Sequence, residues 1–217
     1  MTGRSGRAYA EWYTRPRGAW IGGREFVLLR GLLDARPGES ILDVGCGTGY
    51  FTSRFASETD GSVVGLDPNL DWLRYARRTV DGPTWVAGGA EALPFGDRSF
   101  DLALAVTSLC FIAEERTAVL EMARVTRRRL ALGLLNRHSL LWGEKGRGPH
   151  RGSYEGARWH TPAEARVLVD DLAVHGLRVR TAVFFPSGGV WSRVAERVLP
   201  SRLPWGAFLA VVCDLGE

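Results

Sequence analysis

The chain has 217 residues, 45% of them hydrophobic, which is enough to build one α/β core. Its apolar residues never run together for the roughly 20 positions that a membrane-spanning helix needs, so we expect no span. The three cysteines, Cys46, Cys110 and Cys213, are odd in number and far apart. Because this spacing suits neither a disulfide framework nor a zinc site, we expect a cytoplasmic location and no metal.

The formal net charge of +4 is a small excess, and all but one of the 28 basic residues are arginine, as in proteins of GC-rich genomes. The densest group, Arg127-Arg128-Arg129, directly precedes an apolar run and reads as a solvated turn. Nucleic-acid binders typically show a basic stripe with interleaved aromatic residues. The composition therefore argues against a nucleic-acid partner, and it leaves a monomer and a homodimer open.

The first informative element is a strand over 40–45, followed by a glycine-rich turn and a helix over 51–57. Asp43 lies near the end of the strand, and Gly45, Gly47 and Gly49 follow at every second position. Glycine lets a backbone take positive φ and approach a ligand closely. The dinucleotide fingerprint is G-x-G-x-x-G, so this spacing and the preceding acid indicate a different ligand, with a cationic group for Asp43 to face.

The second element is a strand over 62–67 that ends in Asp67, followed by a turn at Pro68 and a helix over 70–79. An acid at the tip of the second strand is placed to accept hydrogen bonds from ribose hydroxyls. The alternative is that Asp67 serves only as the N-cap of the helix.

Two further strands are predicted over 84–87 and 100–106, and between them lies the segment Gly88-Gly89-Ala90-Glu91-Ala92-Leu93-Pro94-Phe95. Together with the glycine turn and Asp67, this segment resembles the class I S-adenosylmethionine-dependent methyltransferases, in particular the subgroup of the ubiquinone and menaquinone biosynthesis enzymes. The resemblance implies a Rossmann-like, doubly wound α/β fold with seven strands, mostly parallel with an antiparallel last strand. It also implies S-adenosylmethionine as cofactor and a small-molecule acceptor.

The resemblance implies a cofactor site as well. Asp43 is expected to face the methionine ammonium, Asp67 the ribose, and the 89–91 segment the adenine. In the family an acid stands at the position of Gly89, so either Glu91 turns inward as a substitute or it is a solvated surface acid. Thr107 either lies near the methionine end and acceptor or bonds its hydroxyl to backbone. The full set of expected cofactor contacts is Asp43, Gly45, Cys46, Gly47, Gly49, Asp67, Pro68, Gly89, Ala90, Glu91 and Thr107.

The second half of the chain continues the alternation of helices and strands. A helix is predicted over 114–126, and a strand over 130–135. Thr161-Pro162-Ala163-Glu164 forms a capping box, and the helix that it opens is predicted to end at His175-Gly176. The last two strands are predicted over 177–185 and 207–213.

We expect residues 1–217 to form a single methyltransferase domain whose acceptor is covered by segments outside the sheet. These are an amino-terminal lid over 1–30 and two acceptor-side loops over 136–160 and 186–206. A general base for the acceptor, if one is needed, has four candidates, each with a surface or packing role as the alternative: Tyr13, His138, His150 and His160.

The predicted function is methyl transfer from S-adenosylmethionine to a small molecule. An alternative is a protein that binds the cofactor without catalysis or activates a partner methyltransferase, for which the missing acid at Gly89 is the main support. A nicotinamide-dependent oxidoreductase disagrees with the glycine spacing, and a nucleic-acid methyltransferase disagrees with the composition.

Overall fold

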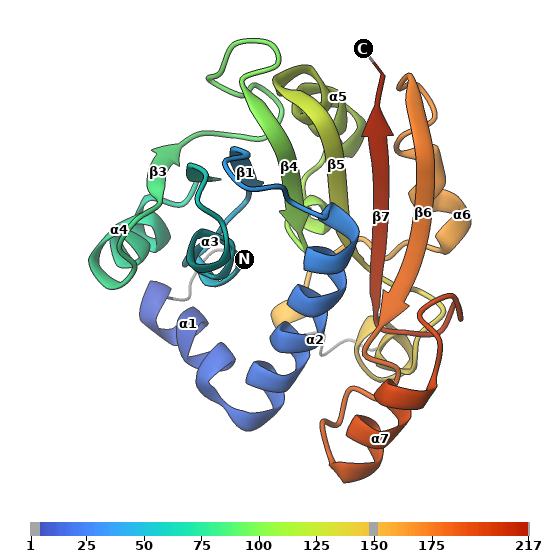
Figure 1. Cartoon of the computed structure of the whole chain (residues 1–217). Helices are drawn as coiled ribbons and strands as arrows, with labels where there is room; N and C mark the ends of the chain where they lie inside the picture. Colours follow the sequence, from blue (N-terminus) through green and yellow to red (C-terminus); the bar gives the residue numbers. More distant parts are fainter. Residues whose placement is uncertain (1–4, 148–151, 217) are drawn as a thin grey trace.

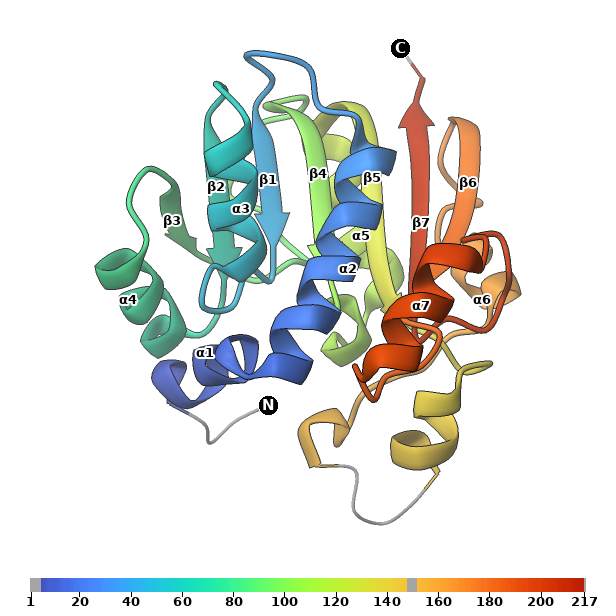
Figure 2. The same cartoon turned by 60° about the horizontal axis from the view of Figure 1, so that its bottom comes forward.

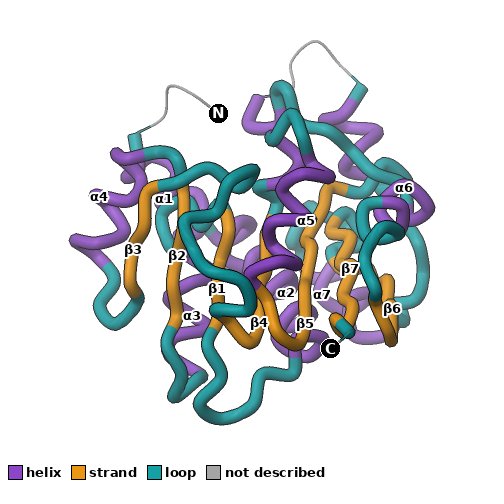
Figure 3. The backbone as a smooth tube through the Cα atoms, turned by 90° about the horizontal axis from the view of Figure 1, so that it is seen from above, coloured by secondary structure: helices purple, strands orange, loops and turns teal. Residues whose placement is uncertain are grey.

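A seven-stranded sheet runs through the molecule, with α2 and α3 on one face and α5 and α6 on the other (Figures 1 and 2). The computed structural model describes residues 5–147 and 152–216. The strands lie in the order β3-β2-β1-β4-β5-β7-β6, as Figure 3 shows from above. Their bounds are β1 Ile41–Val44, β2 Val63–Asp67, β3 Thr84–Ala87, β4 Phe100–Val106, β5 Thr126–Leu135, β6 Val174–Ala182 and β7 Phe208–Leu215.

Strands β1 to β5 pair in parallel, whereas β7 pairs antiparallel with both β5 and β6. The predicted fold class, with its antiparallel last strand, is therefore confirmed. The helices are α1 Gly6–Thr14, α2 Pro16–Leu33, α3 Tyr50–Glu58, α4 Leu70–Thr79, α5 Glu115–Val125, α6 Pro162–Val167 and α7 Val190–Val198. Shorter turns are η1 Leu109–Phe111, η2 Trp142–Gly146 and η3 Gly152–Tyr154.

The core lies on both faces of the central strands. Leu102 and Leu104 of β4 and Leu130 and Leu132 of β5 are completely buried. Parallel strands covered by helices on both sides need such continuous apolar runs, because no side chain on them faces water. This burial explains why β4 could be predicted with its observed ends from sequence alone.

The helix predicted from Thr161 to His175 is wrong in its length. The capping box is present, with Thr161 and Glu164 bonded reciprocally, but α6 ends at Val167. Strand β6 then begins at Val174, and Gly176 lies inside it at φ +57. The pairing with β7 shifts register between His175 and Arg178, so this glycine makes a β-bulge rather than a helix stop.

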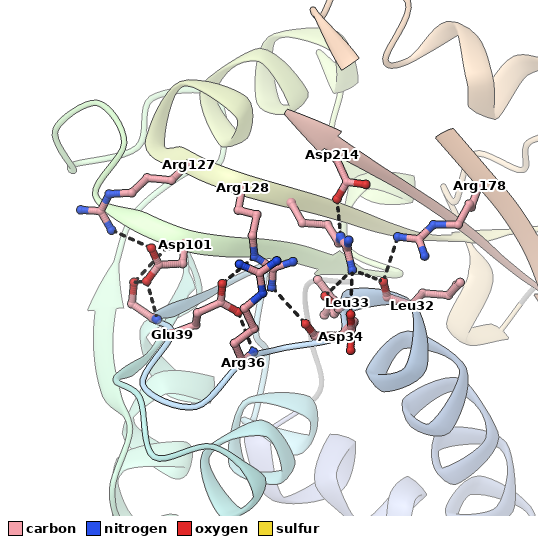
Figure 4. A network of polar contacts seen from close by, with 12 residues as sticks. Leu32, Leu33, Asp34, Arg36, Glu39, Asp101, Arg127, Arg128, Arg178 and Asp214 are labelled. Carbon is pink, nitrogen blue, oxygen red and sulfur yellow. Dashed lines mark hydrogen bonds and ion pairs between the residues drawn. The ribbon is translucent and has the colours of Figure 1, made fainter. Parts of the chain in front are cut away.

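The arginine run is not a solvated turn. Helix α5 passes directly into β5 at Thr126, and Arg127, Arg128 and Arg129 are residues of that strand. Each of the three guanidinium groups meets a carboxylate from another part of the chain (Figure 4). The pairs are Arg127 with Asp101 at 3.2 Å, Arg128 with Glu39 at 2.5 Å and Arg129 with Asp214 at 2.5 Å.

The same arginines also cap helix α2. Arg129 donates to the carbonyl oxygens of Leu32 and Leu33 at 3.1 and 2.9 Å, and Arg128 donates to that of Asp34 at 3.0 Å. These carbonyls belong to the last turn of α2, where they have no partner within the helix. Cations at a helix carboxyl terminus are also favoured by its dipole. The arginines at the start of β5 therefore hold the carboxyl end of α2 against the sheet. They lie at the end of the sheet opposite the carboxyl ends of β1, β2 and β4.

The described residues of the amino-terminal segment predicted as a lid form α1 and α2, and part of the 186–206 loop forms α7. None of the helices in the described part of the chain combines the length and apolarity that a bilayer span requires.

Candidate functional site

A cavity of about 500 Å³ opens at the carboxyl ends of β1, β2 and β4. This is the position at which an open α/β sheet binds ligands. Most of the residues expected to contact the cofactor line it: Gly45, Gly47, Asp67, Pro68, Gly89, Ala90, Glu91 and Thr107. Asp43 and Cys46 line a smaller recess of about 10 Å³ next to it.

The backbone N–H groups of the glycine turn donate hydrogen bonds to residues at the end of β2. The N–H groups of Gly45 and Cys46 both donate to the carbonyl oxygen of Leu66, at 2.7 and 3.0 Å. The N–H of Gly47 donates to Oδ2 of Asp67 at 2.8 Å. A phosphate-binding turn directs its N–H groups at the ligand, whereas these three are used within the protein. The turn is therefore unsuited to a pyrophosphate.

Two of the glycines are required by close packing. A Cβ on Gly45 would lie 2.2 Å from Cβ of Ser108, where β1 and β4 end side by side. Gly49 is the left-handed N-cap of α3, and a Cβ there would lie 2.5 Å from the Trp85 ring. Gly49 thus positions α3 rather than forming the cavity wall. The thiol of Cys46 is buried, and burial raises its pKa well above the ordinary value, which keeps it protonated.

Asp67 joins the glycine turn to the cavity. Its side chain is 5% exposed, and its oxygens accept hydrogen bonds from the N–H groups of Gly47 and Asn69, both at 2.8 Å. Burial raises the pKa of Asp67, although the two backbone hydrogen bonds counteract it. The N-cap of α4 is Asn69, whose side chain accepts from Asp71 and Trp72, so the N-cap alternative for Asp67 is wrong. The carboxylate retains lone pairs that can accept ligand hydroxyls.

Asp43 lies at the bottom of the site. Its carboxylate is 2% exposed and accepts a hydrogen bond from the Thr52 hydroxyl at 2.6 Å. Burial raises the pKa of Asp43 to about 7, the Thr52 hydroxyl opposes this shift, and the charge of Asp67 adds to it. The adjoining recess has room for about one water molecule. A cationic group in front of Asp43 would stabilise the charged carboxylate.

The third wall is the segment after β3. Ala90 is buried, whereas Gly89 and Glu91 are exposed at the rim of the cavity. Gly89 lies outside the left-handed region, and a Cβ there would meet only Oε2 of Glu91, at 3.4 Å. The missing acid is therefore not excluded by the backbone.

Two residues of α5 that were not predicted from the sequence bond the backbone of the segment after β3. Glu121 accepts a hydrogen bond from the N–H of Leu93 at 2.9 Å, and Arg124 donates to the carbonyl oxygens of Leu93 and Phe95. Glu121 and Arg124 also pair with each other across one turn of α5. The i, i+3 spacing of opposite charges could have indicated a pair, but not its partner segment.

Thr107 follows β4 and takes a strained backbone conformation, φ +52, which non-glycine residues rarely adopt. Its hydroxyl donates to the carbonyl oxygen of Val106 at 2.8 Å, and its side chain lines the cavity. The backbone hydrogen bond considered for Thr107 is therefore present, whereas its place near the methionine end and the acceptor stays a prediction. Phe111, Ile112 and Ala113 continue this wall and make it apolar.

Aromatic residues from α1 close the site from the amino-terminal side. Tyr9 stacks on Trp72 with ring centroids 4.6 Å apart, and Tyr13 stacks on Tyr50 at 3.8 Å. Tyr9 lines both the cavity and the recess of Asp43. Tyr9 was not predicted as a site residue; its spacing of four residues from Tyr13, which places both on one helix face, is the signal that could have indicated it.

The four candidates for a general base lie in different surroundings. His138 is exposed, and its backbone N–H bonds Oδ1 of Asn136. His150 lies outside the described residues. Burial raises the pKa of Tyr13 well above 10, so its hydroxyl stays protonated at neutral pH and can donate but not take up a proton.

His160 is buried, and its Nε2 lies 3.1 Å from Oε2 of Glu115, which also pairs with Arg158 at 2.6 Å. Burial would raise the pKa of Glu115, but the hydrogen bonds from His160 and Arg158 lower it below its usual value. The backbone of His160 bridges to Asn136 at the end of β5. This arrangement fastens the 152–160 segment to α5. Within the described residues, no three His, Cys, Asp or Glu side chains are grouped to hold a metal ion.

The strand order, the acid at the tip of β1, the internally bonded glycine turn and Asp67 define a class I S-adenosylmethionine-dependent methyltransferase fold. Residues 42–130 match the family described as the methyltransferase domain. Over these residues the chain thus resembles S-adenosylmethionine-dependent methyltransferase domains, in agreement with the prediction from its sequence.

Curated relatives named as methyltransferases match part of the chain. The chain is 40% identical over 102 residues to the O-methyltransferase cnsE of Penicillium expansum, covering 44% of this chain and 37% of that protein. It is 39% identical over 93 residues to a demethylmenaquinone methyltransferase of Renibacterium salmoninarum, covering 43% and 39%. The chain thus spans less than half the length of these curated relatives.

A solved structure matches nearly the whole chain. A methyltransferase of Thermotoga maritima, described as a possible histamine N-methyltransferase, superposes with a TM-score of 0.76 at 25% identity. The match covers 96% of this chain and 95% of that one. The similarity therefore extends to the helices and strands on both sides of the 42–130 region.

Proposed function

We propose that this chain transfers a methyl group from S-adenosylmethionine to a small-molecule acceptor. The observation that carries the proposal is the continuous cavity that joins a polar wall, at Asp67 and the glycine turn, to an apolar wall at Phe111 and Ile112. A cofactor held on the polar wall would leave its reactive end beside the apolar one. The named activities of the relatives support the same reaction class.

The residues present suit the cofactor. Asp67 can accept hydrogen bonds from two ribose hydroxyls, Asp43 matches a cationic ammonium group, and the backbone at Gly47 can be approached closely because no Cβ stands on it. Ala90 and Glu91 flank the position proposed for the adenine. The cofactor, when bound, supplies a methyl group that is already electrophilic.

The protein's own part in the reaction is to orient the acceptor and to exclude water. Tyr9 and Thr107, which line the cavity next to the apolar wall, are proposed to border the methyl group. The buried His160–Glu115 pair is assigned a structural role, and no general base is assigned. The aromatic lid formed by α1 is proposed to close the site over both ligands.

A cytoplasmic location is proposed as well. The three cysteines are free and buried in the described structure, which suits a reducing compartment. Nucleic acid is not proposed as a substrate, because each arginine of the densest basic group is paired with a carboxylate.

The proposal is tested by incubating the protein with methyl-labelled S-adenosylmethionine and a panel of phenols, carboxylic acids and amines. We expect label in at least one acceptor class, and none with a Gly45→Val variant that remains folded, because its side chain would collide with Ser108 at the turn. Tight binding of the cofactor without label in any class would instead favour a non-catalytic binding protein.

A further inference from the structure

Helix α7 turns polar side chains toward the protein interior and apolar side chains toward solvent, the reverse of the usual arrangement. Its inward residues, Ser192 and Glu196, are polar and buried. Its outward apolar residues, which we call the α7 outer face, are Val190, Trp191, Val194 and Val198, with exposed fractions of 75%, 84%, 44% and 75%. A surface helix of a globular protein normally turns its apolar stripe to the core and its polar side to water.

The inward orientation of Glu196 has a clear cause. The chain leaves β6 through Val183, which takes φ +65, and the N–H groups of Val183 and Phe184 both need partners there. The Glu196 carboxylate accepts both hydrogen bonds, at 2.8 and 3.0 Å. Ser192 adds a bond of 2.7 Å to Ser187. These contacts fix the rotation of α7 about its axis, so its apolar side chains are held facing outward.

The exposed charges of the segment that carries the α7 outer face are of one sign. Between Phe185 and Gly206 the basic residues are Arg193, Arg197 and Arg202, all exposed, and the acidic residue is Glu196, which is buried. A second copy of the chain would bring the same arginines against this face, and like charges would oppose the pairing. The complementary surface must therefore be apolar and negatively charged.

We propose that the α7 outer face docks on the surface of an anionic lipid bilayer. An exposed helix with tryptophan and valine on one face and arginines at its sides suits insertion between lipid head groups, with the cations near the phosphates. Helix α7 lies at the end of the sheet where the parallel strands finish (Figures 1 and 2). Docking here would place this end of the molecule, where the cavity opens, toward the membrane.

The test is co-sedimentation of the full chain with vesicles of phosphatidylcholine alone and of phosphatidylcholine mixed with phosphatidylglycerol. We expect binding to the anionic vesicles, weaker binding to the neutral ones, and loss of binding at high salt. A Trp191→Ser, Val198→Ser variant should bind at least roughly tenfold more weakly, and so should Arg193→Gln with Arg197→Gln. All four positions are exposed, so cofactor affinity should not change.

Matched controls carry the same substitutions elsewhere. Leu120→Ser removes an apolar side chain that is 46% exposed on α5, and Arg36→Gln with Arg166→Gln removes two exposed charges. Both should bind vesicles like the wild type. Failure of the wild type to bind anionic vesicles would overturn the proposal. So would a concentration-dependent dimer, seen in sedimentation velocity, that Trp191→Ser abolishes, because the face would then pair with a second copy.

Discussion

At the level of single residues, Asp43 and Asp67 are two acids at adjacent strand tips with different surroundings. Asp67 accepts two backbone hydrogen bonds, whereas Asp43 accepts one from Thr52 and is more deeply buried. Two acids that line adjoining hollows suit a molecule that carries both hydroxyls and a positive charge. Their pKa values respond to burial in the same direction.

The raised pKa of Asp43 makes stability depend on pH in a defined direction. The folded protein keeps the proton up to about pH 7, while the unfolded chain loses it near pH 4, so this group's contribution falls as pH rises between these values. Relative to wild type, Asp43→Asn should therefore gain about 2–4 kcal/mol in unfolding free energy on going from about pH 4.5 to about pH 8. Urea unfolding of both proteins at each pH measures it.

Asp101 provides the matched control for that comparison. Burial would raise the pKa of Asp101, but hydrogen bonds from Ser40 and the Arg127 guanidinium lower it. Its contribution is present above the unfolded pKa and is lost as pH falls, so Asp101→Asn should show a small dependence of the opposite sign. An Asp43→Asn difference that is the same at both pH values would contradict the assigned burial of Asp43.

Gly89 allows a gain of function to be predicted. Because its backbone is not left-handed and its surroundings are open, Gly89→Asp should fold and should tighten cofactor binding by up to about tenfold. Gly89→Ala tests the backbone alone and should leave the affinity unchanged. Calorimetric titration with S-adenosylmethionine measures both. Weaker binding by a folded Gly89→Asp protein, persisting when the nearby Glu91 is changed to glutamine, would mean that this segment does not hold the adenine.

At the level of elements, α2 shows how a helix can be stabilised from outside. It contains four glycines, which lower helix propensity: Gly18, Gly22, Gly23 and Gly31. Gly18 and Gly22 are nevertheless needed, because a Cβ on either would collide with Trp12 or Tyr50. The helix is held by these contacts and, at its carboxyl end, by the arginines of β5.

Two arginines of the run are expected to contribute unequally to the unfolding free energy. Arg129 is 12% exposed and bonds Asp214 as well as two α2 carbonyls, so Arg129→Met should lower the unfolding free energy by about 2–3 kcal/mol. Arg127 is 45% exposed and pairs only with Asp101, so Arg127→Met should cost less than about 1 kcal/mol. The midpoints of urea unfolding compare the stability of the two variants. Equal losses would show that the α2 cap contributes nothing.

The same tertiary contacts explain what sequence could and could not predict. Strand β4 and helix α4 were predicted with their observed ends, because a continuous apolar run and the turn at Pro68 are local signals. The length of α6 was not predicted correctly. The sequence predicts a helix stop at Gly176, but this glycine forms a bulge in β6 that depends on pairing with β7. Helix α7 was missed because its burial pattern is reversed.

At the level of the whole molecule, the cavity-lining residues could be predicted where they belong to a sequence motif, as Asp67 does. An amino-terminal lid over 1–30 was predicted, but the stacking of Tyr9 and Tyr13 was not, since it depends on how α1 folds back over α3 and α4. In the proposed function, the carboxyl ends of the strands would hold the cofactor and the amino-terminal helices would cover it.

The central claim is that the polar wall binds S-adenosylmethionine through Asp67, and calorimetry tests it most directly. We predict that the wild type binds S-adenosylmethionine but not NAD. Asp67→Ala should remain folded and bind S-adenosylmethionine about 10- to 150-fold more weakly, because a charged hydrogen-bonded contact to the ribose is lost. An unchanged dissociation constant in folded Asp67→Ala, or preferential binding of NAD by the wild type, would contradict the account.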